Sequence, residues 1–288
     1  MLDFGFRIGG EGWGSRGDPD RRQPNPKSKI ENLESKIVPP PRIQSRPVSA
    51  RRLLLFTKPA REGRVKTRLI GDLTPAQAAA LHTAFLDDLL DRLRKGEREG
   101  GFELRLAWAL DAEEAVPAGP LSGVRQEGSD LGERLYRTLS GAAAEAEAGA
   151  VMALGSDHPT LELELVHRAF ERVEAGADVV LGPAEDGGYY LIALDPRAVA
   201  PRLFEGIAWS TDQVLAATLD RCRELGLSVE LLPEASDVDT PEDLRRLAAR
   251  MAAEGDLGCP RTHALLASLG YLQSEIQNPK SKIEGVVA

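Results

Sequence analysis

The densest group of cations in the sequence follows an apolar run without a break. Residues 56–69 read FTKPAREGRVKTRL, and Glu62 is the one acid among them. The five cations are Lys58, Arg61, Arg64, Lys66 and Arg68. Guanidinium and ammonium groups donate to phosphate oxygens, and Gly63 lets the backbone come close to a ligand. The pattern predicts a loop that binds the phosphates of a nucleotide.

The residues predicted to bind phosphate in this loop are Lys58, Arg61, Gly63, Lys66, Thr67 and Arg68. The segment is not a P-loop, because that motif requires a glycine directly before its lysine and Val65 stands there. The competing interpretation is a solvated basic turn. The concentration of cations after one strand favours phosphate binding, and Lys66 is also predicted to be catalytic.

A single carboxylate follows a second apolar run, in the segment GSDHPTL at residues 155–161. Asp157 stands in a Gly-Ser turn before Pro159, which presents it outward at a strand end. Carboxylate oxygens are the ligands that Mg²⁺ prefers, and Mg²⁺ completes its shell with water and substrate phosphates. We predict that Asp157 binds Mg²⁺ or Mn²⁺. The competing interpretation is an aspartate that only shapes a turn or caps a helix.

A second pair of acids lies in SDVDTPEDL, residues 236–244. From Thr240 onward the segment is a helix start, with a capping hydroxyl, a proline and acids in the first turn. Asp237 and Asp239 precede that cap and are not needed for it. Either one could supply the second metal ligand opposite Asp157, and we favour Asp239.

The segment GPAEDGGYYLIAL, residues 182–194, combines a carboxylate with two glycines. Gly187 and Gly188 leave open backbone beside Asp186, which suits a sugar or an acceptor. Asp-Gly is also a strong hairpin signal, and both interpretations can hold together. The residues predicted to contact the sugar or acceptor are Asp186, Gly187, Gly188, Tyr189 and Trp209, and Asp186 is also predicted to be catalytic.

Two further side chains have open roles. Trp209 precedes a helix cap at Ser210 or Thr211, and it is either a stacking surface for a ligand or a packing residue. Arg134 lies at the start of another predicted helix, where it either reaches a phosphate or pairs with a helix neighbour. We count Arg134 among the predicted phosphate-binding residues.

The composition narrows the class of protein. The 288 residues carry a formal net charge of −9, which argues against a general nucleic-acid partner. Cys222 and Cys259 are the two cysteines and form no C-x-x-C pair, so neither a disulfide scaffold nor a cysteine zinc site is expected. No apolar run reaches the about 18 residues of a membrane span, and residues 1–17 lack a signal-peptide core. We therefore expect a cytoplasmic protein.

Strand and helix patterns alternate along the chain and must position these loops. The strand candidates are residues 51–57, 102–110, 151–157, 178–184, 188–194 and 228–233. The helix candidates are residues 74–95, 129–146, 161–176, 211–225, 240–253 and 261–270. This alternation predicts an α/β fold with a mainly parallel sheet and helices on both faces. Ligands of such sheets bind beyond the carboxyl ends of the strands, where the candidate loops lie.

The two ends of the chain differ from the part between them. Residues 1–48 are rich in Gly, Pro, Arg, Ser and Asn, and the heptapeptide NPKSKIE occurs at residues 25–31 and again at residues 278–284. Such segments bury too little apolar surface to fold, so we predict disorder for residues 1–48 and 273–288. Residues 49–272 are the predicted domain, whose closing helices either form a homodimer surface or complete the domain.

The four motifs, taken in order, resemble a bacterial glycosyltransferase-like family associated with arsenosugar biosynthesis. They are FTKPAREGRVKTRL, GSDHPTL, GPAEDGGYYLIAL and DVDTPEDL, and the resemblance covers roughly residues 50–255. It implies the GT-A, Rossmann-like fold of the nucleotide-diphospho-sugar transferases. The basic segment is also similar to 2-phospho-L-lactate guanylyltransferases and molybdenum-cofactor guanylyltransferases.

The resemblance implies a nucleotide near Lys58, Lys66 and Arg68 and a divalent cation at Asp157. The sequence departs from many GT-A enzymes, because Gly155-Ser156-Asp157 has no Asp-x-Asp pair and the full L-x-x-G-x-G-x-R signature is absent. We predict a metal-dependent glycosyltransferase that uses a nucleotide-sugar donor and a small-molecule acceptor. The alternatives are a nucleotidylyltransferase that releases pyrophosphate and a non-catalytic nucleotide-binding protein.

Overall fold

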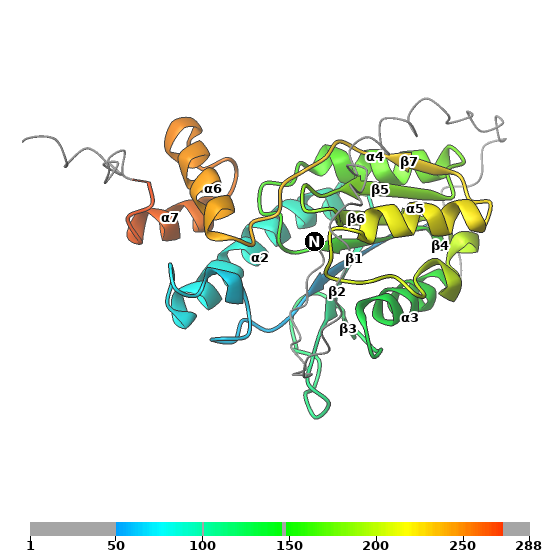
Figure 1. Ribbon diagram of the computed structural model, residues 1–288, viewed down its shortest axis with the longest axis horizontal. Coiled ribbons are helices and arrows are strands. Elements are labelled where there is room, and N and C mark those ends of the chain that lie inside the picture. The colour runs from blue at the N-terminus through cyan, green and yellow to red at the C-terminus, as the bar shows by residue number, and fades with distance from the viewer. Residues whose placement is uncertain (1–49, 100, 146–147, 273–288) are drawn as a thin grey trace, which may run out of the picture.

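The computed structural model describes residues 50–99, 101–145 and 148–272. The predicted disordered ends and both copies of NPKSKIE lie outside the described residues. Within these ranges the chain forms one mixed sheet with helices on both faces (Figure 1). The fold class predicted from the sequence is therefore confirmed.

The sheet has seven strands in the order β3-β2-β1-β4-β6-β5-β7 within the described residues. The strands are β1 (Ala50–Thr57), β2 (Glu103–Trp108), β3 (Gly123–Arg125), β4 (Ala148–Gly155), β5 (Val179–Pro183), β6 (Tyr189–Leu194) and β7 (Val229–Leu231). β6 runs antiparallel to both β4 and β5, and the other neighbouring pairs are parallel. β1, β4 and β5 therefore run in the same direction, and the loops that follow them lie on one side of the sheet, at the carboxyl ends of these strands.

Three of the six α-helices in the described residues begin at a residue whose side chain caps the helix. The α-helices are α2 (Pro75–Arg98), α3 (Leu131–Ala143), α4 (Leu163–Glu174), α5 (Val214–Glu224), α6 (Pro241–Glu254) and α7 (Pro260–Ser268), with short 3-10 turns η1 (Thr67–Leu69), η2 (Pro196–Ala198) and η3 (Pro201–Leu203). Thr74 and Gln77 form a capping box at the start of α2, and Thr240 and Asp243 form another at the start of α6.

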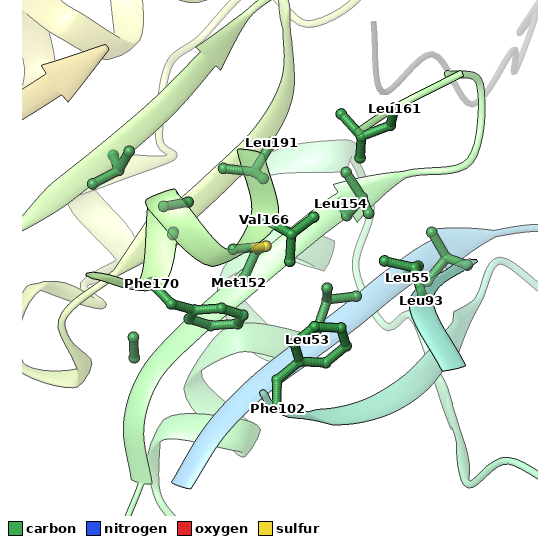
Figure 2. Packing of buried hydrophobic residues seen from close by; sticks show 14 of the residues in the cluster. Leu53, Leu55, Leu93, Phe102, Met152, Leu154, Leu161, Val166, Phe170 and Leu191 are labelled. Atoms are coloured by element: carbon green, nitrogen blue, oxygen red, sulfur yellow. The ribbon is translucent and has the colours of Figure 1, made fainter. Parts of the chain in front are cut away.

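Two apolar clusters hold the helices on the sheet. Leu54 and Phe56 of β1 face α3 and α5, whereas Leu53 and Leu55 face α2 and α4. Successive side chains of a strand point to opposite faces, so β1 serves both clusters. Figure 2 shows Leu53 of β1 and Phe170 of α4 in the second of them. Full burial of such a side chain contributes about 1.5–3 kcal/mol.

A third apolar cluster joins α6 and α7 to α2 at one side of the sheet. Leu81 and Phe85 of α2 pack there with Leu247 of α6 and Leu266 of α7. Leu69 of η1 joins them, so the end of the basic loop belongs to the same cluster. Figure 1 shows α2 (cyan) between the α6–α7 pair (orange to red) and β1. The α6–α7 pair therefore depends on α2 for its position.

β3 is the strand of the described residues that the sequence pattern did not predict. It has three residues, and all three are only partly buried. Gly119 and Pro120 precede it and Gly128 follows it, so local composition indicates a loop. β3 forms because β2 offers a parallel edge, where Leu106 pairs with Gly123 and Trp108 with Arg125. Its existence depends on tertiary pairing rather than on strand propensity.

Candidate active site

Lys66 occupies the centre of the site and is almost fully enclosed. Its side chain is 2% exposed, and its Nζ donates to the carbonyl oxygen of Val238 at 2.8 Å. Nζ lies 3.0 Å from Oδ1 of Asp239 and also forms an ion pair with Oδ1 of Asp157. The structure thus brings together the lysine of the basic loop and both predicted metal ligands.

The backbone at Lys66 has the left-handed conformation, with φ of 47° and ψ of 41°. A residue other than glycine adopts this conformation at a cost of about 1–2 kcal/mol. The strain is offset by the contacts of the side chain, which also lies 5.3 Å from the ring centre of Phe85 on α2. The loop therefore turns at Lys66 in a way that directs the ammonium inward.

Two neighbouring segments hold the carboxylates in place. The backbone N–H of Val238 donates to the carbonyl oxygen of Asp157 at 3.1 Å, which aligns the segment before α6 with the turn after β4. The Asp243 carboxylate accepts from the N–H groups of Asp239 and Thr240, at 3.2 and 2.7 Å. The capping box of α6 thus positions the residue directly before it.

The charges of the three groups do not balance. Burial raises the pKa of Asp157, but Lys66 and the nearby His82 favour its charged form, and the pKa is lowered overall. Burial raises the pKa of Asp239, and Lys66 opposes this only in part. Burial disfavours the charged form of Lys66, yet the two carboxylates raise its pKa. Two carboxylates around one ammonium leave an excess negative charge, so the site favours further positive charge.

A divalent cation fits these side chains. The carboxylates of Asp157 and Asp239 already enclose one cation, the ammonium of Lys66. Their side chains are 17% and 15% exposed, so solvent reaches both. No group of three or more His, Cys, Asp or Glu side chains able to hold a metal occurs in the described ranges. Water and substrate phosphates would complete the shell, as they commonly do for Mg²⁺.

The arginines of the basic loop meet acids from the loop between β2 and β3. Arg61 Nη1 lies 2.7 Å and Arg64 Nη1 lies 3.0 Å from Oδ2 of Asp111. Arg61 also pairs with Glu114. These acids hold both guanidiniums, and Arg61, which was predicted to bind phosphate, therefore contacts carboxylates instead.

The other predicted phosphate-binding residues border the buried lysine. The Arg68 side chain is 49% exposed, and its Nη1 lies 3.9 Å from Oδ2 of Asp239. Thr67 is exposed and Lys58 is partly buried. Gly63 has φ of +71°, and a Cβ added there would meet no atom within 4 Å, so Gly63 serves the turn itself. Arg68 is thus an exposed cation of this loop beside the Asp239 carboxylate, and Thr67 is exposed next to Lys66 in the chain.

The EDGG turn joins β5 to β6 at the same sheet edge. Asp186 is exposed, and its Oδ1 accepts from the N–H of Gly188 at 3.1 Å. Gly187 has φ of +88°, and a Cβ there would stand 2.2 Å from the carbonyl oxygen of Asp212. Tyr189 is 2% exposed and lies in the core under α5. The structure therefore presents Asp186 to solvent but turns the Tyr189 ring away from the site.

Trp209 and Arg134 both lie near the start of α3. A Cβ at Gly132 would stand 2.6 Å from Nε1 of Trp209, and the Trp209 ring packs against the α3–α5 cluster. Nε of Arg134 donates to the carbonyl oxygen of Gly128 at 3.2 Å. Trp209 thus packs against the start of α3, and Arg134 fastens the turn before that helix.

Side chains of α2 and of the β2–β3 loop also border the site, and none of them was among the predicted site residues. His82 is 2% exposed, and its Nε2 lies 3.1 Å from the carbonyl oxygen of Lys58. Burial lowers the pKa of His82, and the nearby Asp157 carboxylate opposes this only in part. The available signal was the presence of His82 among the apolar positions of α2. Asp111 had no comparable signal, because it stands in a loop.

The fold and the site together define a class of protein. The mostly parallel mixed sheet with helices on both faces matches the fold of a nucleotide-diphospho-sugar transferase-like structure. A solved structure from Desulfovibrio desulfuricans G20, described as a "putative nucleotide-diphospho-sugar transferase", is 31% identical to the chain. The match covers 78% of this chain and 97% of that one, with a TM-score of 0.70.

The chain belongs to the same family as the Desulfovibrio protein. The model of the family "Uncharacterized protein conserved in bacteria (DUF2064)" matches residues 90–211. The structural homologue is a transferase, which confirms the prediction of a transferase enzyme.

More distant solved structures also match the chain. A cytidylyltransferase from Leptospira borgpetersenii serovar Hardjo-bovis (strain JB197) is 12% identical and covers 79% of this chain and 98% of its own, with a TM-score of 0.46. A CMP:2-keto-3-deoxy-manno-octonic acid synthetase with bound CTP is 16% identical over 72% of this chain and 100% of its own, with a TM-score of 0.45. No curated protein matches the sequence. Among the described helices, none is long and apolar enough to cross a membrane.

Proposed function

We propose that the protein is a metal-dependent glycosyltransferase that moves a sugar from a nucleoside-diphosphate donor to a small-molecule acceptor. The observation that supports this most is the enclosure of the Lys66 ammonium by Asp157 and Asp239. Two carboxylates from distant segments face one cation beside a phosphate-binding type of loop. The family relationship to the Desulfovibrio protein supports the same class of reaction.

Asp157 and Asp239 would hold Mg²⁺ or Mn²⁺. When bound, the ion supplies positive charge that stabilises the nucleoside-diphosphate leaving group. Until a ligand arrives, the Lys66 ammonium partly compensates the charge of the two carboxylates that it contacts. Arg68 and Thr67 lie at the solvent side of the carboxylates, where they can donate to phosphate oxygens.

The EDGG turn would bind the acceptor or the sugar. The exposed carboxylate of Asp186 accepts a hydrogen bond from the N–H of Gly188, which orients it. A carboxylate accepts several hydrogen bonds, so it can also accept one from a hydroxyl group of the ligand. Gly187 lets the turn pack closely against the backbone of Asp212, which holds Asp186 in place at the start of α5. In this proposal Asp186 orients the attacking hydroxyl and takes up its proton as the new glycosidic bond forms.

A nucleotidylyltransferase is the second candidate, and the number of cations favours it. In that reaction a substrate phosphate attacks the α-phosphate of a nucleoside triphosphate and pyrophosphate leaves. Arg61 and Arg64 both meet acids in the structure and would become donors if those acids moved away. Their charge exceeds what one diphosphate needs, whereas a triphosphate could use it.

Thermal unfolding with Mg²⁺ and a panel of nucleoside diphosphates, triphosphates and nucleotide sugars tests the proposal. A ligand at about 100 times its dissociation constant adds roughly 2.7 kcal/mol to the free energy of unfolding. Stabilisation by one nucleotide sugar, lost in Asp157→Ala, is the expected result. Preference for a triphosphate would support the second candidate, and no stabilisation by any ligand would contradict both.

Product analysis then identifies the acceptor. The resemblance to proteins associated with arsenosugar biosynthesis adds arsenic-containing small molecules to the acceptors worth testing. Release of a nucleoside diphosphate that depends on the acceptor is expected for glycosyl transfer. Release of pyrophosphate would instead identify the reaction as nucleotidyl transfer.

A further inference from the structure

Arg92 of α2 joins two loops that are far apart in the sequence. Its Nη1 donates to the carbonyl oxygens of Pro159 and Leu161, at 2.6 and 2.9 Å. Its Nη2 donates to the carbonyl oxygen of Gly258 at 2.8 Å and contacts the Cys259 sulfur at 3.4 Å. One guanidinium therefore binds the turn that follows Asp157 and the loop that leads into α7.

The first of these loops follows Asp157, and the second follows the far end of α6, the helix whose start adjoins Asp239. Asp157 stands two residues before Pro159 in the first turn. Asp239 stands directly before the cap of α6, whose far end leads into the loop that Arg92 binds. The thiol of Cys259 also donates to the carbonyl oxygen of Pro159 at 3.1 Å, so the two loops contact each other as well.

An arginine suits this position for a geometric reason. Its planar group has five N–H donors in a fixed arrangement, whereas a lysine has a single nitrogen on a flexible stem. The turn at residues 157–161 has irregular backbone, and buried carbonyl groups need partners. Arg92 satisfies the carbonyls of Pro159 and Leu161 from one side, which fixes the path of the chain after Asp157.

We propose that Arg92 is a positioning residue that sets the placement of Asp157 relative to Asp239. It does so by holding the 157–161 turn and the α6–α7 pair on one helix. The proposal rests on the proposed function only in taking the bound cation to be Mg²⁺ or Mn²⁺. Arg92 contacts neither carboxylate, and its effect on the site passes through the backbone of the two loops.

The competing role for Arg92 is merely to dock α7, and Asp88 provides the matched control. Asp88 lies one turn before Arg92 on α2 and is 2% exposed. Its carboxylate accepts from the N–H groups of Arg261 and Thr262, at 3.1 and 2.8 Å, and so caps α7. Its hydrogen bonds go to α7 and not to the 157–161 turn. Loss of Asp88 should weaken the docking of α7 but leave that turn bound.

The experiment compares wild type with Arg92→Ala, Arg92→Lys and Asp88→Asn, all well below their unfolding temperatures. Mn²⁺ affinity is measured by electron paramagnetic resonance. Groups that hydrogen-bond directly to metal ligands typically change affinity by about 10- to 100-fold, and Arg92, which acts through the backbone, should have an effect at the lower end of this range. We expect Arg92→Ala to weaken Mn²⁺ binding about tenfold, Arg92→Lys to be intermediate, and Asp88→Asn to stay close to wild type.

A second readout needs no metal. The ¹⁵N signal of the Lys66 ammonium should be protected from hydrogen exchange in wild type, because this side chain is 2% exposed between two carboxylates. Arg92→Ala should lose that protection as Asp157 shifts, and Asp88→Asn should keep it. If Arg92→Ala does not fold, Arg92→Lys is compared with Asp88→Asn in the same two measurements.

The outcomes separate the two proposals. Equal changes in the Arg92 and Asp88 variants would reduce Arg92 to a helix-docking residue and overturn the inference. Unchanged Lys66 protection in Arg92→Ala would also overturn it. If wild type binds no Mn²⁺ but Lys66 loses protection only in the Arg92 variants, the proposed metal-dependent reaction fails and the positioning role stands.

Discussion

The ammonium of Lys66 lies 3.0 Å from Oδ1 of Asp239, although 173 residues separate them along the chain. The loop after β1 carries Lys66, and the segment before the cap of α6 carries Asp239. The contact is supported by the packing of α6 and α7 on α2 and by the hydrogen bond from the N–H of Val238 to the carbonyl oxygen of Asp157. The centre of the site is therefore also a long-range link that holds the domain together.

Replacing Lys66 by methionine should destabilise the protein strongly. Two mostly buried carboxylates would then face each other without a cation, and removing one partner of a buried ion pair typically costs about 3–5 kcal/mol. The measurement is urea-induced unfolding of wild type and Lys66→Met at neutral pH. Added Mn²⁺ should restore part of the lost stability in Lys66→Met, because the metal can replace the missing positive charge.

Arg68→Met is the control for that variant. Arg68 is 49% exposed and 3.9 Å from the Asp239 carboxylate, and an exposed ion pair contributes only about 0–1 kcal/mol. Similar stabilities of Lys66→Met and wild type would show that Lys66 is not needed to compensate the carboxylates. A loss that Mn²⁺ does not reverse would argue against a cation at this position.

Gly187→Ala should disrupt the EDGG turn. An added Cβ would stand 2.2 Å from the carbonyl oxygen of Asp212, and φ is +88°. Gly226→Ala is a matched control, because Gly226 has φ of +68° but no atom within 4 Å of its Cβ position. Left-handed strain alone costs about 1–2 kcal/mol, so the Gly226 variant should lose about that much stability.

The Gly187 variant should lose more, since the clash with backbone adds to the strain. Both variants are measured by urea-induced unfolding, and ligand binding is then compared in whichever folds. Equal losses of stability would show that the chain near Asp212 moves away freely. That outcome would contradict the close packing of the EDGG turn against the start of α5.

Local sequence patterns predicted the strands and α-helices of the described residues with one exception. The capping residues Thr74 and Thr240 and the turn glycine Gly187 reveal helix starts and a hairpin from a few neighbouring residues. β3 escaped because its three residues form a strand only by pairing with β2. Information that lies in a partner strand cannot be read from the segment itself.

The candidate site was predictable as a set of loops but not as a network. Because ligands of such sheets bind at the carboxyl ends of the strands, the sequence predicts that Lys66, Asp157 and Asp239 lie near one another there. Pairwise contacts follow from the paths of the loops, and sequence does not specify them. Examples of such contacts are the ion pairs of Arg61 and Arg64 with Asp111 and the hydrogen bonds of Arg92 to two loops.

The acids that hold the basic loop should weaken phosphate binding. Asp111→Asn removes the carboxylate that lies 2.7 Å from Arg61 and 3.0 Å from Arg64. Because exposed ion pairs contribute about 0–1 kcal/mol, we expect nucleotide affinity to rise about two- to fivefold at low ionic strength. Isothermal titration calorimetry with the nucleotide that stabilises wild type measures this change.

Salt provides an internal check on that result. The difference should shrink at about 1 M salt, where the screening length falls to about 3 Å. Asp220→Asn, which removes a partner of Arg223 on α5, serves as a control of equal charge. A gain of the same size in the control would mean that net charge alone acts, and no gain in Asp111→Asn would leave the arginines without a role in phosphate binding.

His82 should make the stability of the protein depend on pH below neutrality. Burial lowers its pKa from an ordinary value of 6.5, so the folded protein keeps this ring neutral at a pH where the unfolded chain protonates it. The unfolded state then binds more protons, and the free energy of unfolding falls as pH decreases through 6.5. Well above pH 6.5 the ring is neutral in both states and contributes no slope.

His82→Gln keeps a donor toward the carbonyl oxygen of Lys58, which Nε2 of His82 approaches at 3.1 Å, but it cannot titrate. Urea-induced unfolding of both proteins from pH 7.5 to pH 5.5 isolates the contribution of the histidine, since the other groups titrate alike. The curve of wild type should fall more steeply than that of the variant. Parallel curves would mean that His82 takes up its proton equally well in the folded and the unfolded protein. The ring would then carry a positive charge beside the basic loop and would not act as a neutral hydrogen-bond donor.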